Sequence, residues 1–458
     1  MNMDYLAQFK AKMAAAGLAP VVIDTFSRYY RELQSGEKGF IANRDIAPIT
    51  PDEVTDYKRL APLAAKGARY FSKTVMIRLN GGLGTGMGLQ GPKSLLSVKN
   101  GRTFLDIIHA QTAVQQTRLC LMNSFSTDAA TLKVLRGKTP LPGTFLQHRF
   151  PKVLQESLAP ATWTPNPDHE WNPPGHGDVF TALLTSGCLH ELLKSGIQYA
   201  FIANIDNLGA MVDPTLLGYF VRQKSPFMME VAQKTPGDKK GGHLAKLPNG
   251  RFVLREVAQC PADELEAFTD INVFRYFNTN NIWIDLKALK QIFESESSLP
   301  LPMIVNPKTV DPRDSNSPPV FQIESAMGAA ISLFDGAQAV CVPRTRFMPV
   351  KKCADLMLIR SDCYRLKDDH ALSRAASVKT MLPKIDLDGR YYGKVDDFDD
   401  RFPAGVPSLK NCRSLEIQGD VHFGQNIVCQ GEIRLANNTP KPVTLADGLI
   451  LEGVTEFN

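Results

Sequence analysis

Apolar residues in the N-terminal part of the chain recur with the period of a helix. Leu6, Phe9 and Met13 lie three to four positions apart, and a second set with the same spacing runs from Val22 to Leu33. A loop-like segment that contains two prolines follows at residues 46–54. This pattern predicts a small helical cap over residues 1–65.

The pattern changes at Val75 to short apolar runs that are typical of buried strands. The runs lie close to Asn, Asp or Lys residues and cover residues 75–79, 119–122, 200–205 and 227–231. Between the first two runs, a predicted helix carries four apolar residues on one face: Phe104, Ile107, Ile108 and Val114. Alternating strands and helices favour a largely parallel sheet in a three-layer α/β fold, and ligands of such sheets bind beyond the carboxyl ends of the strands.

The C-terminal part shows a third pattern, in which pairs of apolar residues repeat every six positions. The pairs run from Leu415 to Leu435, and after an insert at residues 437–442 they resume and end at Leu451. A six-residue period is typical of a parallel β-helix, in which three short faces form a coil of about 18 residues. An antiparallel meander is the alternative, but hairpins rarely keep one period over so many positions.

Length and composition agree with a folded protein of several domains. A chain of 458 residues is long enough for two or three domains, and 43% hydrophobic with 22% charged residues is typical of globular proteins. We expect the helical cap at residues 1–65, an α/β domain at 66–375 and a β-helix domain at 376–458.

Charge and cysteine content exclude several classes of function. The net charge of +5 is spread without a basic block, so we expect no nucleic-acid partner. The eight cysteines form no CxxC pair, which excludes common zinc and dithiol spacings and predicts reduced, mostly buried thiols. No stretch resembles a signal peptide or a membrane span, so we expect a cytoplasmic protein with no membrane partner.

The strongest local motif is a glycine-rich loop directly after the run at residues 75–79. Residues 79–93 read LNGGLGTGMGLQGPK, with six glycines in eleven positions and a terminal Lys93. Glycines let the backbone approach a ligand closely and turn its N–H groups toward an anion. The loop therefore predicts a phosphate site, with a purely structural turn as the alternative.

Two familiar phosphate motifs fail against this loop. Pro92 separates Gly91 from Lys93, so the lysine cannot begin a helix as the Walker motif requires. The dinucleotide pattern GxGxxG fits Gly86, Gly88 and Gly91, but the second strand ends at Asn123, where an acidic ribose-binding residue is expected.

The loop instead resembles the signature of nucleotidyltransferases that make nucleoside-diphosphate sugars, with its Gly-Gly, Gly-Thr and later Pro-Lys. Further segments resemble the eukaryotic-type UTP–glucose-1-phosphate uridylyltransferase family in the family's own order, namely LMNSFST (121–127), WNPPGHGDVF (171–180), FIANIDNLGAMVD (201–213), FNTNNIW (277–283), IVNPKT (304–309) and PRTRFMPVK (343–351). The resemblance extends from about residue 70 to the C-terminal repeat. It implies a Rossmann-like, glycosyltransferase-A-like mixed sheet, with the C-terminal β-helix left-handed.

The implied reaction joins UTP to glucose 1-phosphate and gives UDP-glucose and pyrophosphate reversibly. A sugar phosphate oxygen attacks the α-phosphorus of UTP, so two polyanions must meet, and catalysis should rest on positioning and cations. Lys93 can neutralise the triphosphate, while N–H groups near Gly81, Gly82 and Gly84 hold it. Asp206 at a strand end can hold Mg²⁺, the expected cofactor, or can cap the following turn.

Several other polar residues are candidates for binding the nucleotide and the sugar. His176 in Gly-His-Gly-Asp can donate a hydrogen bond to a ligand, and the short polar residues Asn278 to Asn281 suit sugar hydroxyls, unless they form only an asparagine-rich turn. The resemblance implies that Lys351 is a second phosphate-binding lysine and that His176, Asn278 and Asn280 contact the sugar. It implies nucleotide contacts for a further set: Leu79, Asn80, Gly81, Gly82, Gln147, Gly175 and Asn204.

Two rival functions stay open at this point. The enzyme could use another sugar 1-phosphate, such as N-acetylglucosamine 1-phosphate, or the protein could be a non-catalytic nucleotide-sugar scaffold. The presence of Lys93, Asp206 and Lys351 favours catalysis over the scaffold. The C-terminal repeat carries no comparable cluster of charges, and we expect it to serve as the contact surface of a homo-oligomer.

Overall fold

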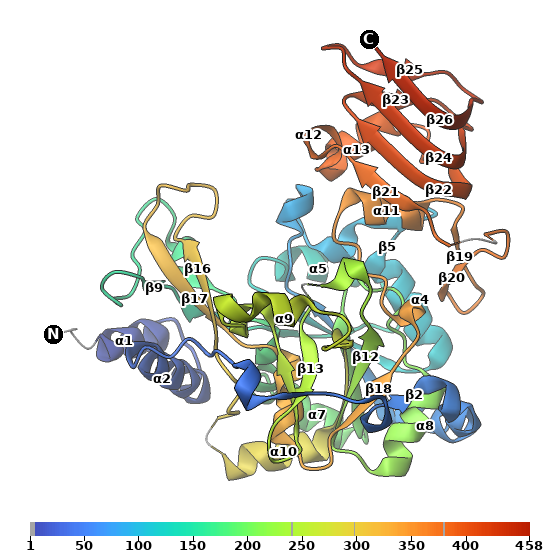
Figure 1. Cartoon of the computed structure of the whole chain (residues 1–458). Coiled ribbons are helices and arrows are strands. Elements are labelled where there is room, and N and C mark those ends of the chain that lie inside the picture. Colours follow the sequence, from blue (N-terminus) through green and yellow to red (C-terminus); the bar gives the residue numbers. More distant parts are fainter. Residues whose placement is uncertain (1–4, 240, 297, 379–380) are drawn as a thin grey trace.

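The computed structural model describes residues 5–239, 241–296, 298–378 and 381–458. Residues 1–4 of the predicted cap and residues 379–380 of the predicted C-terminal domain lie outside these ranges. Figure 1 shows a central α/β body with a pair of N-terminal helices on one side and a stack of C-terminal strands on the other. Within the described ranges, no helix is long and apolar enough to cross a lipid bilayer.

The N-terminal helices form as the apolar spacing predicts. Helix α1 (Leu6–Ala15) buries Leu6, Phe9 and Met13, and α2 (Pro20–Gln34) begins with a proline at its first turn. The buried faces of both helices pack against apolar side chains of the α/β body, including Phe150 and Ile323. The cap is therefore attached through an apolar contact.

The rest of the segment predicted as cap reaches into the large sheet. Strand β1 (Ala47–Pro48) pairs with β13 (His243–Lys246), and β2 (Thr55–Asp56) pairs with β18 (Gln338–Cys341). A short helix, α3 (Ala64–Ala68), then leads to the first central strand. Only the first half of residues 1–65 is thus a separate helical layer.

The central sheet is mixed, and it has 11 strands within the described residues. Its main path runs β2-β18-β12-β15-β11-β3-β6-β7, with β1, β13 and β14 beside it. Strand β15 is antiparallel to both β11 and β12, whereas β11, β3, β6 and β7 are parallel, as predicted. The remaining strands of this sheet are β3 (Thr74–Asn80), β6 (Arg118–Asn123), β7 (Gly143–Leu146), β11 (Tyr199–Asn204), β12 (Phe227–Gln233), β14 (Phe252–Arg255) and β15 (Tyr276–Asp285).

Side chains of β3 alternate between two apolar clusters, one on each face of the sheet. Met76 joins the cluster that contains α4 (Phe104–Gln115), α8 (Pro214–Gln223) and α11 (Cys353–Arg360). Val75 and Ile77 join the cluster that contains α6 (Val179–Thr185), α7 (Cys188–Lys194) and α10 (Leu286–Ser295). The predicted three-layer arrangement is confirmed.

One helix prediction is wrong in detail. Phe104, Ile107 and Ile108 are buried, but Val114 is 53% exposed. Val114 lies in the last turn of α4, which ends at Gln115, and its side chain faces away from the cluster on that side of the sheet. The shared face therefore includes only the first part of the helix.

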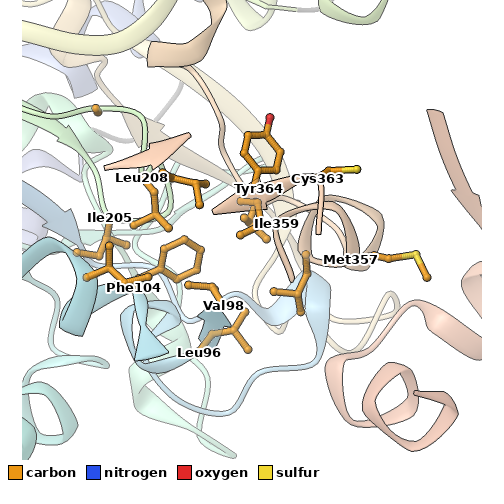
Figure 2. Close-up of a cluster of buried hydrophobic side chains, with 14 of the residues drawn as sticks. Leu96, Val98, Phe104, Ile205, Leu208, Met357, Ile359, Cys363 and Tyr364 are labelled. Atoms are coloured by element: carbon orange, nitrogen blue, oxygen red, sulfur yellow. The ribbon is translucent and has the colours of Figure 1, made fainter. Parts of the chain in front are cut away.

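The core beside α4 also holds the loop that follows β11. Figure 2 shows Ile205 and Leu208 next to Phe104, with Leu96 and Val98 below and residues of α11 opposite. Shorter elements surround this body, namely α5 (Asp128–Leu135), α9 (Leu265–Thr269), β4 (Ser97–Lys99), β5 (Arg102–Thr103), β8 (Phe150–Pro151), β9 (Val153–Leu154), β10 (Trp171–Asn172), β16 (Ile304–Thr309), β17 (Pro319–Glu324), β19 (Tyr364–Leu366) and β20 (Leu372–Arg374).

The C-terminal strands are parallel to one another, which contradicts the meander alternative. One sheet has the order β21 (Lys384–Leu387), β22 (Ser408–Gln418), β24 (Val428–Asn437) and β26 (Ile450–Phe457), and β23 (Val421–Phe423) pairs with β25 (Val443–Leu445). Leu415 lies opposite Ile433, 18 residues later in the chain. Helices α12 (Gly389–Tyr392) and α13 (Val395–Arg401) flank these strands.

Candidate active site

A cavity of about 490 Å³ lies at the carboxyl ends of the parallel strands β3 and β11. All the predicted site residues line it except Asn80 and Asn278. Residues that line the cavity are Leu79, Gly81, Gly82, Gly84, Lys93, Met122, Gln147, Pro173, Gly175, His176, Asn204, Ile205, Asp206, Asn280 and Lys351. Residues from six separate motifs of the sequence therefore meet at the edge of the sheet where the α/β pattern places ligands.

The glycine loop forms one wall of this cavity. Strand β3 ends at Asn80, and the loop returns so that the Lys93 N–H donates to the Gly82 carbonyl at 3.2 Å. At Gly81, a Cβ atom would lie 2.8 Å from the Gln147 Oε1 atom, so a larger residue there would displace the end of the Gln147 side chain. The loop thus brings backbone N–H groups and a lysine to the same wall.

The charged centre of the site consists of Asp206 and two lysines. Lys93 Nζ donates to Asp206 Oδ2 at 2.7 Å, and Lys351 Nζ donates to the same oxygen at 3.0 Å. The side chains of Lys93 and Asp206 are 11% and 6% exposed, whereas that of Lys351 is 58% exposed. Two cations facing one carboxylate give the cavity a positive balance that suits a phosphate chain.

The loop that carries Asp206 is tied to the segment that carries Lys351. The Val350 N–H donates to the Asp206 carbonyl at 3.2 Å, and the Met348 N–H donates to Asn207 Oδ1 at 2.9 Å. The positions of Asp206 and Lys351, more than a hundred residues apart in the chain, are therefore fixed relative to each other, which the sequence alone does not indicate.

Asp206 has a free acceptor that a metal could use. Its Oδ1 atom is buried and has no hydrogen-bond partner. No group of three or more His, Cys, Asp and Glu side chains that could hold a metal occurs in the described part of the chain. A divalent cation at Asp206 would therefore take most of its ligands from substrate oxygens and water, as Mg²⁺ does at phosphate sites.

His176 is held as a neutral hydrogen-bond donor. Its Nδ1 atom accepts a hydrogen bond from the Met327 N–H at 3.0 Å, which leaves the proton on Nε2. Burial, and to a smaller extent the charge of Lys351, lowers the pKa of His176 to about 4. At neutral pH the ring can therefore donate to a ligand without adding a charge.

Gly175, next to His176, adopts a backbone conformation that favours glycine. Its φ angle is +78°, and a Cβ atom there would lie 2.4 Å from the Ser325 carbonyl oxygen. The Gly175 carbonyl accepts a hydrogen bond from Gln147 Nε2 at 2.8 Å. Gln147 and Gly175, both predicted to contact the nucleotide, are therefore in direct contact with each other.

A β-bulge explains why Asn280 reaches the cavity. Strand β15 shifts register opposite Glu230 and Val231, and Asn280 has a φ angle of +57°. Asn278 donates from Nδ2 to Asn280 Oδ1 at 2.8 Å and accepts from the Asn280 N–H at 2.9 Å. Asn278 thus supports Asn280 from behind, and its own predicted sugar contact stays a prediction.

Asn80 faces away from the cavity in this structure. Its Nδ2 atom donates to Asn123 Oδ1 at 2.8 Å and to Thr131 Oγ1 at 3.0 Å. Its side chain therefore holds β3 to β6 and α5, and its predicted nucleotide contact stays a prediction.

Sequence reasoning did not single out three apolar residues of the cavity. Met122 and Pro173 lie on the side of Gln147 and Gly175, and Ile205 precedes Asp206. Each belongs to a motif that the resemblance had already marked, but an apolar side chain carries no chemical signal of its own in a sequence.

Comparisons with known proteins agree with this geometry. The family model described as UTP–glucose-1-phosphate uridylyltransferase matches residues 23–430. The chain is 39% identical to the UTP–glucose-1-phosphate uridylyltransferase of Solanum tuberosum over 96% of this chain and 94% of that protein. It is 40% identical to the enzyme of that name from Saccharomyces cerevisiae, over 94% of this chain and 88% of the relative.

Solved structures of UDP-glucose pyrophosphorylases are similar to this chain over its whole length. A point mutant of UDP-glucose pyrophosphorylase from Leishmania major in complex with UDP-glucose superimposes with a TM-score of 0.90 at 38% identity and covers 100% of both chains. A UDP-glucose phosphorylase from Trypanosoma brucei gives a TM-score of 0.87 at 42% identity, over 99% of this chain and 100% of that one. The chain therefore belongs to the UTP–glucose-1-phosphate uridylyltransferase family.

Proposed function

We propose that this protein catalyses the Mg²⁺-dependent, reversible reaction of UTP with glucose 1-phosphate to give UDP-glucose and pyrophosphate. The observation that carries the proposal is the cluster of Lys93, Lys351 and Asp206 in the cavity. This cluster offers two cations and one hard anionic ligand, which is what the meeting of two phosphate-bearing substrates requires.

In the proposed reaction, the chain's own residues bind and orient the phosphates. The N–H groups of the loop near Gly81 and Gly82, together with Lys93, hold the triphosphate of UTP. Lys351 donates to the same oxygen of Asp206 and is 58% exposed, so its ammonium group can turn to the incoming sugar phosphate. The sugar phosphate oxygen attacks the α-phosphorus and pyrophosphate leaves, and no general base is needed because the attacking phosphate is already ionised.

We assign the remaining cavity residues to the uridine and to the sugar. Gln147 and Gly175 touch each other and present an amide and a backbone group, which suits the base of the nucleotide. We assign Leu79, Gly81, Gly82 and Asn204 to the same nucleotide, together with the main chain of Asn80, whose side chain holds β3 to β6. His176 through its Nε2 proton, with Asn278 and Asn280, suits the hydroxyl groups of the sugar.

Asp206 is the residue that would hold Mg²⁺. A bound Mg²⁺ supplies positive charge that neutralises phosphate oxygens and stabilises the leaving pyrophosphate. The free Oδ1 atom of Asp206 supports this assignment, because it is buried in a cavity where no donor of the described chain satisfies it.

Three further proposals concern the whole molecule. We divide the chain into an N-terminal region (1–65), in which α1 and α2 form the helical cap and β1 and β2 join the central sheet, a nucleotidyltransferase domain (66–375) and a C-terminal domain (376–458). We describe the C-terminal domain as a left-handed parallel β-helix, which the parallel pairing and the 18-residue register support. Ile450 and Val454, which are 61% and 67% exposed on the outer strand β26, support a homo-oligomer through this domain.

The cellular compartment is also proposed. All eight cysteines carry free thiols. Free thiols are stable in a reducing compartment, and we assign the protein to the cytoplasm.

One assay tests the proposed function. The purified protein is incubated with UTP and glucose 1-phosphate, with Mg²⁺ or with EDTA, and pyrophosphate release is measured. We expect release only in the presence of both substrates and the metal. Faster release with N-acetylglucosamine 1-phosphate would mean that this compound, and not glucose 1-phosphate, is the preferred sugar substrate. No release with any sugar 1-phosphate would favour a non-catalytic scaffold.

A further inference from the structure

Arg78 of strand β3 carries a charge into the interior of the α/β body. Its side chain is fully buried. It forms no ion pair with a carboxylate of the described residues. Burial of an unpaired charge is costly, and an apolar side chain of similar length would fill the same space at lower cost. The presence of arginine here therefore needs an explanation beyond packing.

The guanidinium group of Arg78 gathers backbone carbonyl groups from a single loop. Nη1 donates to the carbonyl oxygens of Asn204 at 2.9 Å and Asn207 at 3.1 Å, and Nη2 donates to the carbonyl oxygen of Ala210. Nε contacts the sulfur of Met76 at 3.3 Å. The planar arrangement of N–H groups in arginine suits such a set of acceptors, and the loop closes around it.

The same loop carries Asp206 at its centre. The Ile205 N–H donates to the Leu79 carbonyl at 3.2 Å, which joins the start of the loop to the end of β3. Ile205 and Leu208, on either side of Asp206 and Asn207, point into the apolar core (Figure 2). The loop around Asp206 is thus fixed by the hydrogen bonds of Arg78 and by the buried side chains of Ile205 and Leu208.

A comparison with Arg346 shows that Arg78 is not simply one half of a structural ion pair. Arg346 is also buried, but it donates two hydrogen bonds of 2.7 Å to the carboxylate of Glu230. Burial, followed by the charge of Arg346, lowers the pKa of Arg78 to about 9, and the carboxylate of Asp206 acts in the opposite direction. Asp206 is therefore the acidic group whose field reaches Arg78.

We propose that Arg78 is a positioning residue for Asp206, because it fixes the backbone of residues 204–210 and so fixes the carboxylate against Lys93 and Lys351. The inference rests on the proposed function, since it takes Asp206 as the metal ligand. Arg78 does not line the cavity and acts only through the loop. Without the guanidinium group, Asp206 loses its fixed place, while Gln147 and Gly175 keep theirs.

The test compares Arg78→Met, Arg78→Lys and the control Arg401→Met with the wild-type protein. Arg401 is a partly buried arginine that pairs with Asp420 and donates to the Asp397 carbonyl, away from the cavity. For Arg78→Met we expect kcat to fall about 10- to 100-fold and the half-saturating Mg²⁺ concentration to rise about tenfold, while KM for UTP at saturating Mg²⁺ changes less than about threefold. Arg78→Lys should recover only part of kcat, because an ammonium group can also donate to carbonyl oxygens but lacks the planar set of N–H groups that reaches all three.

Wild-type turnover is measured first, so a failure of the proposed function is seen separately from a failure of this inference. If Arg78→Met folds and keeps both kcat and the Mg²⁺ half-saturation within twofold of wild type, Arg78 is only structural. If Arg78→Met does not fold, Arg78→Lys decides: a lowered kcat and a raised Mg²⁺ requirement with an unchanged KM for UTP support the inference, and any other pattern overturns it. A shift of the Mg²⁺ requirement in Arg401→Met equal to that in Arg78→Met would also overturn it, since the effect would then be one of general stability.

Discussion

Replacement of Asp206 by asparagine should separate nucleotide binding from turnover. In the free protein, one oxygen of Asp206 accepts from Lys93 at 2.7 Å and from Lys351 at 3.0 Å, so a phosphate chain must compete with the carboxylate for both lysines. Asparagine keeps the shape and removes the negative charge. Metal-free UTP should therefore bind more tightly, while the ligand for Mg²⁺ is lost.

The size of the effect on binding follows from the charges. A unit charge about 4 Å away contributes about 1 kcal/mol in water and about 4 kcal/mol in a partly buried site. The cavity is open to solvent on the side of Lys351, which is 58% exposed, so the lower part of this range applies. We expect metal-free UTP to bind about tenfold more tightly to Asp206→Asn. Turnover should fall about a hundredfold, and the Mg²⁺ requirement should rise.

Folding stability should change in the opposite direction to UTP affinity. Lys93 is 11% exposed, and in Asp206→Asn it has no carboxylate partner. Breaking a buried pair in this way typically costs about 3–5 kcal/mol. The melting temperature of the variant without ligand should therefore fall. Addition of UTP should raise the melting temperature of the variant by more than it raises that of the wild-type protein.

Three measurements check this reasoning. Calorimetric titration with UTP in EDTA gives the metal-free affinity, a Mg²⁺ titration of turnover gives the metal requirement, and thermal melts with and without UTP give the stability. Asp335→Asn is the control, because it changes the net charge equally but lies outside the cavity, where Asp335 pairs with the exposed Arg251. The reasoning is refuted if Asp206→Asn binds metal-free UTP no more tightly than wild type and its Mg²⁺ titration overlays the wild-type curve.

The other predictions concern the lysine, the His-Gly loop and the C-terminal strands. Lys93→Met should fold and lose turnover about a hundredfold, worth about 3 kcal/mol, and near-wild-type turnover would contradict its role. Burial lowers the pKa of His176 to about 4, so the unfolded protein takes up a proton at this residue at a higher pH than the folded protein does. The contribution of neutral His176 to stability is therefore complete above about pH 6.5 and is lost as the pH falls toward 4. Melting temperatures of His176→Gln across this range should depend less on pH than those of wild type. Gly175→Ala should destabilise the protein by about 1–3 kcal/mol in denaturant titrations, because its Cβ would meet the Ser325 carbonyl, and an unchanged midpoint would show that the loop can shift. Deletion of residues 412–458 cuts β22 and exposes its apolar side. Light scattering and thermal melts should therefore show altered assembly or lower stability. A truncated protein that is soluble and folded, with unchanged assembly but no turnover, would mean that this domain completes the active site.

The sequence by itself determined the local elements and the location of the chemistry. Apolar runs at residues 75–79, 119–122 and 200–205 predicted buried strands of a largely parallel sheet, because a buried strand needs apolar residues on both faces, and these runs form β3, β6 and β11. The glycine loop and Asp206 follow two of these strands, and the carboxyl ends of parallel strands meet at one edge. The six-residue period likewise predicted parallel pairing in the C-terminal part, since only stacked coils need the same apolar spacing in every layer.

Tertiary structure alone decided how the site is held. The attachment of Asp206 to Val350 and of Asn207 to Met348 joins residues that no local pattern relates, and a lysine such as Lys351 carries no signal until the fold brings it to a carboxylate. The bulge that turns Asn280 into the cavity depends on how β15 pairs with β12, so the sequence could not distinguish Asn280 from Asn278. Local patterns record which face of an element is buried, whereas the direction of a polar side chain depends on long-range contacts that form only when the elements pack together.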